Sequence, residues 1–169
     1  MSRNIEIKAR ARDLKKQAQL AVKLADGNPE VIFQEDTFFN VPFGRLKLRV
    51  FEDGTGELIQ YERPDSRDPS ESKYLLYATN NPEPLKEALT NALGVRAIVR
   101  KLRRVYLRGQ TRIHFDQVEG LGDYIELEVV LEEDQQSIQG VAIAEELMAK
   151  LEIGEDDLID TAYVDLIFD

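Results

Sequence analysis

The sequence contains no cysteine and no tryptophan, and only one histidine, 10 glycines and six prolines among 169 residues. The lack of cysteine excludes a disulfide framework, thiol catalysis and metal sites built on thiolates. Low glycine and proline contents, together with 43% hydrophobic residues, exclude a disordered or collagen-like chain and are typical of a globular protein. We therefore expect residues 1–169 to form a single domain.

Long hydrophobic runs are also missing. No stretch approaches the ~18 apolar residues that a membrane-spanning helix needs, and the first residues contain no apolar segment of the kind found in signal peptides. Neither G-x-x-x-x-G-K-[ST] nor G-x-G-x-x-G occurs, so phosphate would not be bound by a P-loop or a Rossmann turn. We expect a cytoplasmic protein with no membrane partner.

The net charge of −10 argues against a nucleic-acid partner, because such domains present a basic surface to phosphates. The charge is unevenly distributed along the chain. Residues 1–112 hold 21 Lys and Arg against 15 Asp and Glu, whereas residues 113–169 hold one Lys against 17 acids. No linker separates these two parts, so they must fold together. A solvated basic face and a solvated acidic face would explain this pattern. Whether this explanation suffices depends on where the charges lie on the strands, and on which face.

Alternation of apolar and polar residues, together with turn signals, predicts eight strands and a few helices. The strands are expected at residues 5–12, 31–40, 45–51, 57–63, 73–78, 98–107, 111–118 and 124–131. Helices are expected at residues 14–25, 84–93 and 137–151, with a short last helix starting near Asp156. Most of the strands are joined as hairpins. The fold class is therefore α+β, with an antiparallel sheet that is closed or nearly closed.

The polar faces of five of these strands carry rows of charged side chains. The rows are Glu6 and Lys8; Arg45, Lys47 and Arg49; Lys101 and Arg103; Arg112, His114 and Asp116; and Glu126 and Glu128. Like charges side by side repel, so such rows normally persist where an opposite charge or a ligand neutralises them. If these faces turn inward, cations line one wall of the barrel and carboxylates another. Such a cavity suits a polyanion and a divalent metal.

Each row alone also has a simpler explanation. A carboxylate pair such as Glu126 and Glu128 is typical of the solvent side of a strand, and an Arg-x-Lys-x-Arg row also suits a surface patch for lipid headgroups or acidic partners. We interpret His114 as a packing or hydrogen-bonding residue, because no triad partners are evident around it. Oxygen ligands, no cysteine and a single histidine favour Mg²⁺ or Mn²⁺ over zinc.

Five segments, taken in order, resemble the CYTH or triphosphate tunnel enzymes, which include class IV adenylate cyclases and thiamine triphosphatases. The resemblance covers nearly the whole chain. The last segment and the spacing from Asp116 to Glu126 are specific, and the order of all five segments is more specific still. The segments are Asn4-Ile-Glu6-Ile-Lys8, close to an E-x-E-x-K signature; Asp36-Thr-Phe-Phe39; Gly44-Arg-Leu-Lys-Leu-Arg49; Lys101-Leu-Arg103; and Thr111-Arg-Ile-His-Phe-Asp116 continuing to Glu126-Leu-Glu128.

The resemblance implies an eight-stranded antiparallel tunnel that is open at both ends. By this analogy the divalent metals would be bound by Glu6, Glu126 and Glu128. The triphosphate oxygens would be bound by Lys8, Lys47, Arg49, Lys73, Lys101, Arg103 and Arg112. Asp116 would orient one of those cations or join the metal shell, and the catalytic residues would be Lys8, Arg112 and Asp116. Phosphoryl transfer is accelerated mainly by positioning and charge neutralisation, which this set of residues could supply.

Two positions depart from the family pattern. Asn4 stands where the signature has its first glutamate, which removes a charge from the metal site. Glu62 stands about where many relatives carry a lysine, and alternation predicts that the neighbouring Arg63 points the other way, out of the cavity. We therefore do not predict Glu62 or Arg63 as site residues.

Three functions are consistent with these residues. The first is a class IV adenylate cyclase-like enzyme that converts ATP to cyclic AMP and pyrophosphate. The second is a triphosphatase that acts on inorganic triphosphate or thiamine triphosphate, and the third is a triphosphate-binding module without catalysis, for which the loss of the first glutamate is the main reason. No residue is assigned to adenine. A homodimer is compatible with an antiparallel domain of this size, but the sequence does not determine the oligomeric state.

Overall fold

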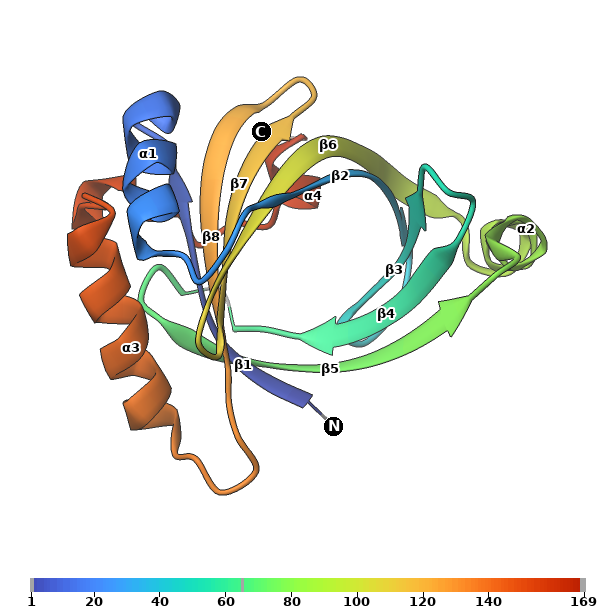
Figure 1. Cartoon of the computed structure of the whole chain (residues 1–169). Helices are drawn as coiled ribbons and strands as arrows, with labels where there is room; N and C mark the ends of the chain where they lie inside the picture. Colours follow the sequence, from blue (N-terminus) through green and yellow to red (C-terminus); the bar gives the residue numbers. More distant parts are fainter. Residues whose placement is uncertain (1, 65, 168–169) are drawn as a thin grey trace.

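The computed structural model describes residues 2–64 and 66–167 and contains a closed barrel of eight antiparallel strands (Figure 1). The strand order around the barrel is β1-β5-β4-β3-β2-β6-β7-β8. This architecture confirms the predicted fold class. The strands are β1 (Ser2–Arg10), β2 (Glu30–Phe39), β3 (Arg45–Phe51), β4 (Gly56–Glu62), β5 (Ser70–Thr79), β6 (Val95–Arg108), β7 (Thr111–Val118) and β8 (Gly122–Val130).

Helices flank the barrel on two sides. Helices α1 (Leu14–Leu24) and α3 (Ser137–Lys150) lie along one side, and α2 (Pro82–Leu93) lies on the opposite side (Figure 1). The largest apolar core sits between the barrel wall and α1 and α3. It is formed by residues that include Ile7, Ile113, Ile125, Leu147 and Leu151. Within the described ranges, no helix combines the length and apolar character needed to cross a membrane.

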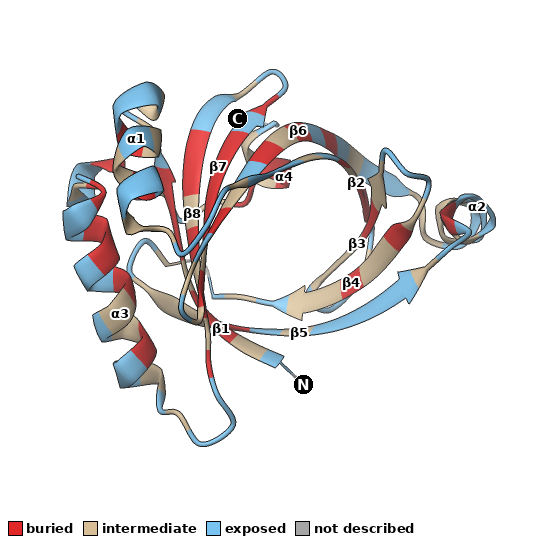
Figure 2. Ribbon diagram, in the orientation of Figure 1, coloured by how far each residue is buried: buried red, intermediate tan, exposed pale blue. Residues whose placement is uncertain are grey.

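Strand alternation explains why the interior is polar. On β1, Ile5, Ile7 and Ala9 are buried against the helices, and the intervening Glu6 and Lys8 line the inside of the barrel. Because successive side chains point to opposite faces, each strand that packs apolar residues under a helix turns its polar residues inward. Figure 2 shows buried segments on β7 and β8, near the helices, whereas half of the residues of β5 are exposed.

The end of the chain differs from the sequence prediction. A single last helix was expected from near Asp156, but a short 3₁₀ turn, Glu155–Asp157, is followed by an extended segment and a separate helix α4 (Tyr163–Leu166). The extended segment forms because the chain here pairs with β1. Ala9 bridges Leu158, and the backbone N–H of Ile159 donates to the carbonyl of Lys8.

Helix α4 and the residue before it pack against the barrel. Ala162, Tyr163 and Val164 are buried in an apolar cluster with residues from the strand ends, which include Phe38 and Val99. These three consecutive side chains leave water by packing there, which fixes the C-terminal segment against the strands.

Helix α3 approaches β1 closely at Gly140, which gives a first prediction. A Cβ atom at this position would lie 2.6 Å from Cγ1 of Ile5 and 2.7 Å from Cδ2 of Leu131. We expect Gly140→Ala to lower the free energy of unfolding by about 1–3 kcal/mol through overpacking, even though alanine is favoured over glycine in helices by about 1 kcal/mol. Urea unfolding measures the change.

The matched control for Gly140→Ala is the same substitution in an Ile5→Ala background. Ile5→Ala removes one of the two atoms that would clash, so Gly140→Ala should cost less there than in the wild-type protein, and the two substitutions should not be additive. A stabilising effect of Gly140→Ala in the wild-type background would contradict the close packing of α3 on β1.

Candidate functional site

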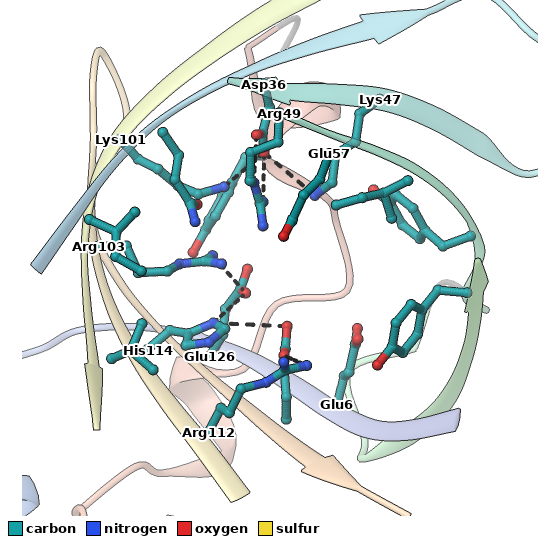
Figure 3. Close-up of a pocket in the computed structure, with 18 of the residues that line it drawn as sticks. Glu6, Asp36, Lys47, Arg49, Glu57, Lys101, Arg103, Arg112, His114 and Glu126 are labelled. Carbon is teal, nitrogen blue, oxygen red and sulfur yellow. Dashed lines mark hydrogen bonds and ion pairs between the residues drawn. The ribbon is translucent and has the colours of Figure 1, made fainter. Parts of the chain in front are cut away.

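The interior of the barrel contains a cavity of about 530 Å³ lined by side chains from all eight strands. Figure 3 shows charged side chains from different strands pointing into this one space. The charged rows predicted from the sequence therefore face inward. The alternative, that these rows form a solvent-exposed surface, is excluded because most of these side chains are buried or half-buried.

Three cations gather around one buried carboxylate on the wall formed by β2, β3 and β6. Asp36 is 1% exposed. Arg49 donates to both of its oxygens, with Nε to Oδ1 and Nη2 to Oδ2 each at 2.8 Å. The Nζ atoms of Lys101 and Lys47 lie 3.0 and 3.4 Å from Oδ2 of Asp36. The cluster follows from register, because Asp36 and Arg49 are direct partners between β2 and β3.

These contacts change the pKa values of the cluster. Burial by itself would raise the pKa of Asp36, but Arg49, Lys101 and Lys47 hold it well below its usual range. Burial and the neighbouring arginines lower the pKa of Lys101 to about 7 and that of Lys47 to about 8, although Asp36 acts in the opposite direction. One carboxylate does not neutralise three cations. This wall therefore carries excess positive charge, as a site for an anion requires.

A second buried pair positions an arginine on the adjoining wall. Nε and Nη2 of Arg103 each lie 2.7 Å from an oxygen of Asp116, which is fully buried. The hydroxyl of Tyr163 donates to Oδ2 of the same carboxylate at 2.9 Å. Asp116 does not line the cavity. It was predicted as a catalytic residue that orients a cation or joins the metal shell, and the geometry matches the first role, as a positioning residue behind Arg103.

A group of acids lies on the wall formed by β7, β8 and β1. Ligand atoms of His114, Glu126 and Glu128 all lie within 4.8 Å of one another. Glu6 is the register partner of Glu128, and burial together with the charge of Glu128 raises the pKa of Glu6 to about 7. His114 was interpreted as a packing or hydrogen-bonding residue, but its Nδ1 lies 3.5 Å from Oε2 of Glu126 inside this acidic group.

Cations also border the acidic group. Nζ of Lys8 lies 3.4 Å from Oε1 of Glu126 and 3.8 Å from the centre of the Tyr163 ring. Nη2 of Arg112 lies 2.8 Å from Oε2 of Glu128. Acids and cations thus lie next to one another on this wall, where a metal ion and an anion could be bound side by side.

The donor set fits a divalent metal ion. His114, Glu126 and Glu128 supply three ligand atoms close together, and Glu6 supplies a further carboxylate beside them. Oδ1 of Asn4 is buried and accepts no hydrogen bond within the described part of the chain, although Nδ2 of the same side chain lies 3.5 Å from Glu6. Carboxylate and amide oxygens are ligands that Mg²⁺ and Mn²⁺ prefer, so these residues suit either ion.

Most predicted site residues come together in this cavity. Those that line it are Glu6, Lys8, Lys47, Arg49, Lys101, Arg103, Arg112, Glu126 and Glu128. Lys73 does not. It is exposed on the outer face of β5, and its neighbours Ser72 and Tyr74 line the cavity instead. The prediction for Lys73 is corrected on this ground, because alternation cannot turn residues 72 and 73 to the same face.

The prediction that Arg63 points away from the cavity is wrong. Arg63 lines it, whereas Glu62 is exposed. Asp36 and Tyr163 were not predicted as site residues either. The signal for Asp36 was its place in the family-like segment Asp36-Thr-Phe-Phe39. Tyr163 had no signal, because it reaches the site only through the packing of the C-terminal segment.

The chain matches the CYTH domain family over residues 2–163. It belongs to the CYTH family. A protein of Methanocaldococcus jannaschii named "Putative adenylate cyclase" is 24% identical to it, over 96% of this chain and 97% of the relative. The family membership agrees with the resemblance drawn from the five sequence segments.

Solved structures share the fold. The PH1012 protein of Pyrococcus horikoshii has a TM-score of 0.84 and 24% identity, covering 96% of this chain and 98% of that one. A Hippeastrum protein described as a "putative adenylyl cyclase" with a dominant triphosphatase activity has a TM-score of 0.68 and 14% identity, covering 99% of this chain and 95% of that one. At these identities the similarity establishes the barrel of this CYTH protein and not its reaction.

The Asp36 cluster gives a second prediction. Asp36→Asn removes the negative charge and leaves Arg49, Lys101 and Lys47 buried without it. We expect this substitution to lower the free energy of unfolding by about 3–5 kcal/mol, because breaking a buried pair leaves an uncompensated charge. Urea unfolding at neutral pH measures the loss.

Asp134→Asn is the matched control for Asp36→Asn, because Asp134 is exposed and such surface substitutions change stability by about 0.5 kcal/mol or less. Sulfate or tripolyphosphate should partly restore the stability of Asp36→Asn by supplying a negative charge. Equal stability of the Asp36 and Asp134 variants would show that the cluster does not depend on its carboxylate.

Proposed function

We propose that this CYTH protein is a divalent-metal-dependent enzyme that acts on a nucleoside triphosphate and converts ATP to cyclic AMP and pyrophosphate. The observation that carries the proposal is the pairing of an excess of buried cations around Asp36 with a carboxylate and histidine group in one cavity. A triphosphate needs the first set of residues, and its metal ion needs the second.

In this reaction the ribose 3′-oxygen attacks the α-phosphorus, its proton is released, and the bond to the bridging oxygen of pyrophosphate breaks. Lys47, Arg49 and Lys101 would hold phosphate oxygens and neutralise the charge that develops on the pyrophosphate. Arg103, fixed by Asp116, would do the same without needing to reorient. A metal ion held by Glu6, Glu126, Glu128 and His114 would supply Lewis-acid stabilisation.

The size and lining of the cavity support a nucleotide over a bare triphosphate. A volume of about 530 Å³ falls within the roughly 300–1,000 Å³ of sites for small organic ligands. Apolar side chains also line it, including Ile32, Phe51, Val105 and Leu107, and these give an uncharged part of the ligand a place to bind. The name of the M. jannaschii relative points to the same reaction.

A triphosphatase is the second candidate. The fold similarity to the Hippeastrum protein, whose description reports a dominant triphosphatase activity, favours it. The same cations would then hold the substrate while water attacks the terminal phosphorus. Which phosphorus is attacked depends on how deeply the triphosphate enters the cavity.

Product analysis tests this proposal. The purified protein is incubated with ATP, inorganic triphosphate or thiamine triphosphate, each with Mg²⁺ or Mn²⁺, and the products are separated by chromatography. We expect cyclic AMP and pyrophosphate in equal amounts from ATP, and no product when EDTA is present. Orthophosphate without cyclic AMP would instead establish a triphosphatase. Binding without any product would contradict catalysis and leave a triphosphate-binding module.

The metal assignment gives a separate prediction. Glu128→Gln keeps the size of the side chain but removes a charge from the group formed with His114 and Glu126. We expect it to weaken Mn²⁺ binding by at least about 10-fold and to lower metal-dependent turnover. Titration with Mn²⁺, followed by electron paramagnetic resonance, measures the affinity.

Glu57→Gln is the control for the metal assignment. Glu57 also lines the cavity but lies outside the group whose ligand atoms are within 4.8 Å of one another. Its substitution should change the Mn²⁺ affinity far less than Glu128→Gln does. Equal losses in the two variants would mean that the metal is held by the overall negative charge of the cavity and not by this group.

A further inference from the structure

Gln34 is a buried amide on the cavity wall whose carbonyl has no partner in the fold. It lies on β2, is 3% exposed and lines the cavity. Its Oε1 atom is buried and accepts no hydrogen bond from any donor within residues 2–64 and 66–167. A buried carbonyl without a hydrogen bond is costly, so native proteins normally provide a partner. Gln34 therefore has an acceptor available for a ligand in the cavity.

Gln17 shows how this protein satisfies a buried amide that supports the fold. It lies on α1, is 2% exposed and does not line the cavity. Its Nε2 donates to the carbonyl of Leu151 at 3.1 Å, and its Oε1 accepts from the backbone N–H of Asp13 at 3.2 Å. Both ends of this amide are used within the fold. The carbonyl of Gln34 is not, which distinguishes Gln34 from a glutamine with a structural role.

Gln34 lies where the charged part of the cavity meets its apolar part. Two residues along β2 in one direction is Asp36 with its three cations, and two residues in the other direction is Ile32. The register partners of Gln34 are Lys101 on β6 and Phe51 on β3. All of these residues line the cavity. An uncharged polar group at this boundary suits the part of a ligand that joins phosphates to an apolar group.

In a nucleoside triphosphate, the part between the phosphates and the base is the ribose. We propose that Gln34 binds this ribose, with its side-chain carbonyl accepting a hydrogen bond from the 2′-hydroxyl. The inference rests on the proposed function, in which the 3′-hydroxyl must stay free to attack the α-phosphorus. A site that accepts a hydrogen bond from a substrate hydroxyl discriminates against analogues without it, because its own polar group is then left unpaired. Gln34 thus selects ribonucleoside triphosphates over 2′-deoxyribonucleoside triphosphates.

The test compares two nucleotides that differ in the 2′-hydroxyl alone. The probes are α,β-methylene-ATP and its 2′-deoxy derivative, each with Mg²⁺, because the methylene bridge prevents release of pyrophosphate. Isothermal titration calorimetry with the full chain measures both affinities. We expect the wild-type protein to bind the ribonucleotide about 10-fold more tightly, as the loss of one hydrogen bond to a buried group predicts. Equal affinities in the wild-type protein overturn the inference without recourse to any variant.

Gln34→Met keeps the length of the side chain and removes the amide. We expect it to bind the ribonucleotide about 10-fold more weakly than the wild-type protein does, with little change for the 2′-deoxy derivative, so that the preference disappears. Gln117→Met is the matched control. Gln117 is exposed on β7 and does not line the cavity, and its substitution should leave the preference intact. A wild-type preference in Gln34→Met overturns the inference.

Two further readouts separate ribose binding from a structural role. Gln34→Met should unfold in urea at the same concentration as the wild-type protein or at a higher one, because it removes a buried carbonyl that has no partner. Its affinity for inorganic tripolyphosphate, titrated in EDTA so that no turnover occurs, should stay within about twofold of the wild-type value, because this ligand has no ribose. Reduced stability with equal weakening of all three ligands would show a structural role and overturn the inference.

Product analysis distinguishes failure of this inference from failure of the proposed function. If ATP gives cyclic AMP and the wild-type protein does not distinguish the two nucleotides, the inference fails and the proposed function holds. If the preference depends on Gln34 but ATP gives no cyclic AMP, the proposed reaction fails and the assignment of Gln34 holds. If the wild-type protein binds neither nucleotide, both fail.

Discussion

Neutralisation of buried charge is the constraint on which this barrel depends. Strand alternation turns apolar side chains outward under α1 and α3, so the charged ones are forced inside, where water screens them poorly. Two buried aspartates meet this constraint. Asp36 holds three cations together, and Asp116 fixes Arg103 with help from Tyr163. These pairs keep the cavity folded and at the same time hold its cations in fixed positions.

The uneven charge along the chain reflects the same constraint. Most cations of the cavity come from the first 112 residues, and the acids of β7 and β8 come from the remainder. Closing the barrel brings the two together, so that Lys8 meets Glu126 and Arg112 meets Glu128. Asp165 near the C-terminus likewise pairs with Arg45 and Arg96. The charges of the two parts complement each other inside one domain, and the wall around Asp36 keeps an excess of positive charge.

Much of the fold and the site could be predicted because both follow local periodicity. Period-two alternation on β1, β3, β6 and β8 identified the inward rows, and nine of the residues assigned from the family resemblance line the cavity. Errors arose where a strand begins or ends. Lys73 lies near the start of β5 and Arg63 just beyond β4, where a shift of one residue reverses the face of every side chain. An alternating sequence pattern therefore predicts which side chains point inward only within the regular part of a strand, and not at its ends.

The sequence alone determined the fold class, the inward rows and the chemistry they offer, because residue type and a spacing of two suffice for these. The tertiary structure decided which charged or polar groups find a partner in the barrel. Partners such as Asp36 and Lys101, or Asp116 and Tyr163, lie 65 and 47 residues apart, and only the strand register brings them together. It also decided that α4 packs against the barrel and that Nε and Nη2 of Arg63 find no acceptor among residues 2–64 and 66–167, because both depend on contacts between distant segments that no local pattern encodes.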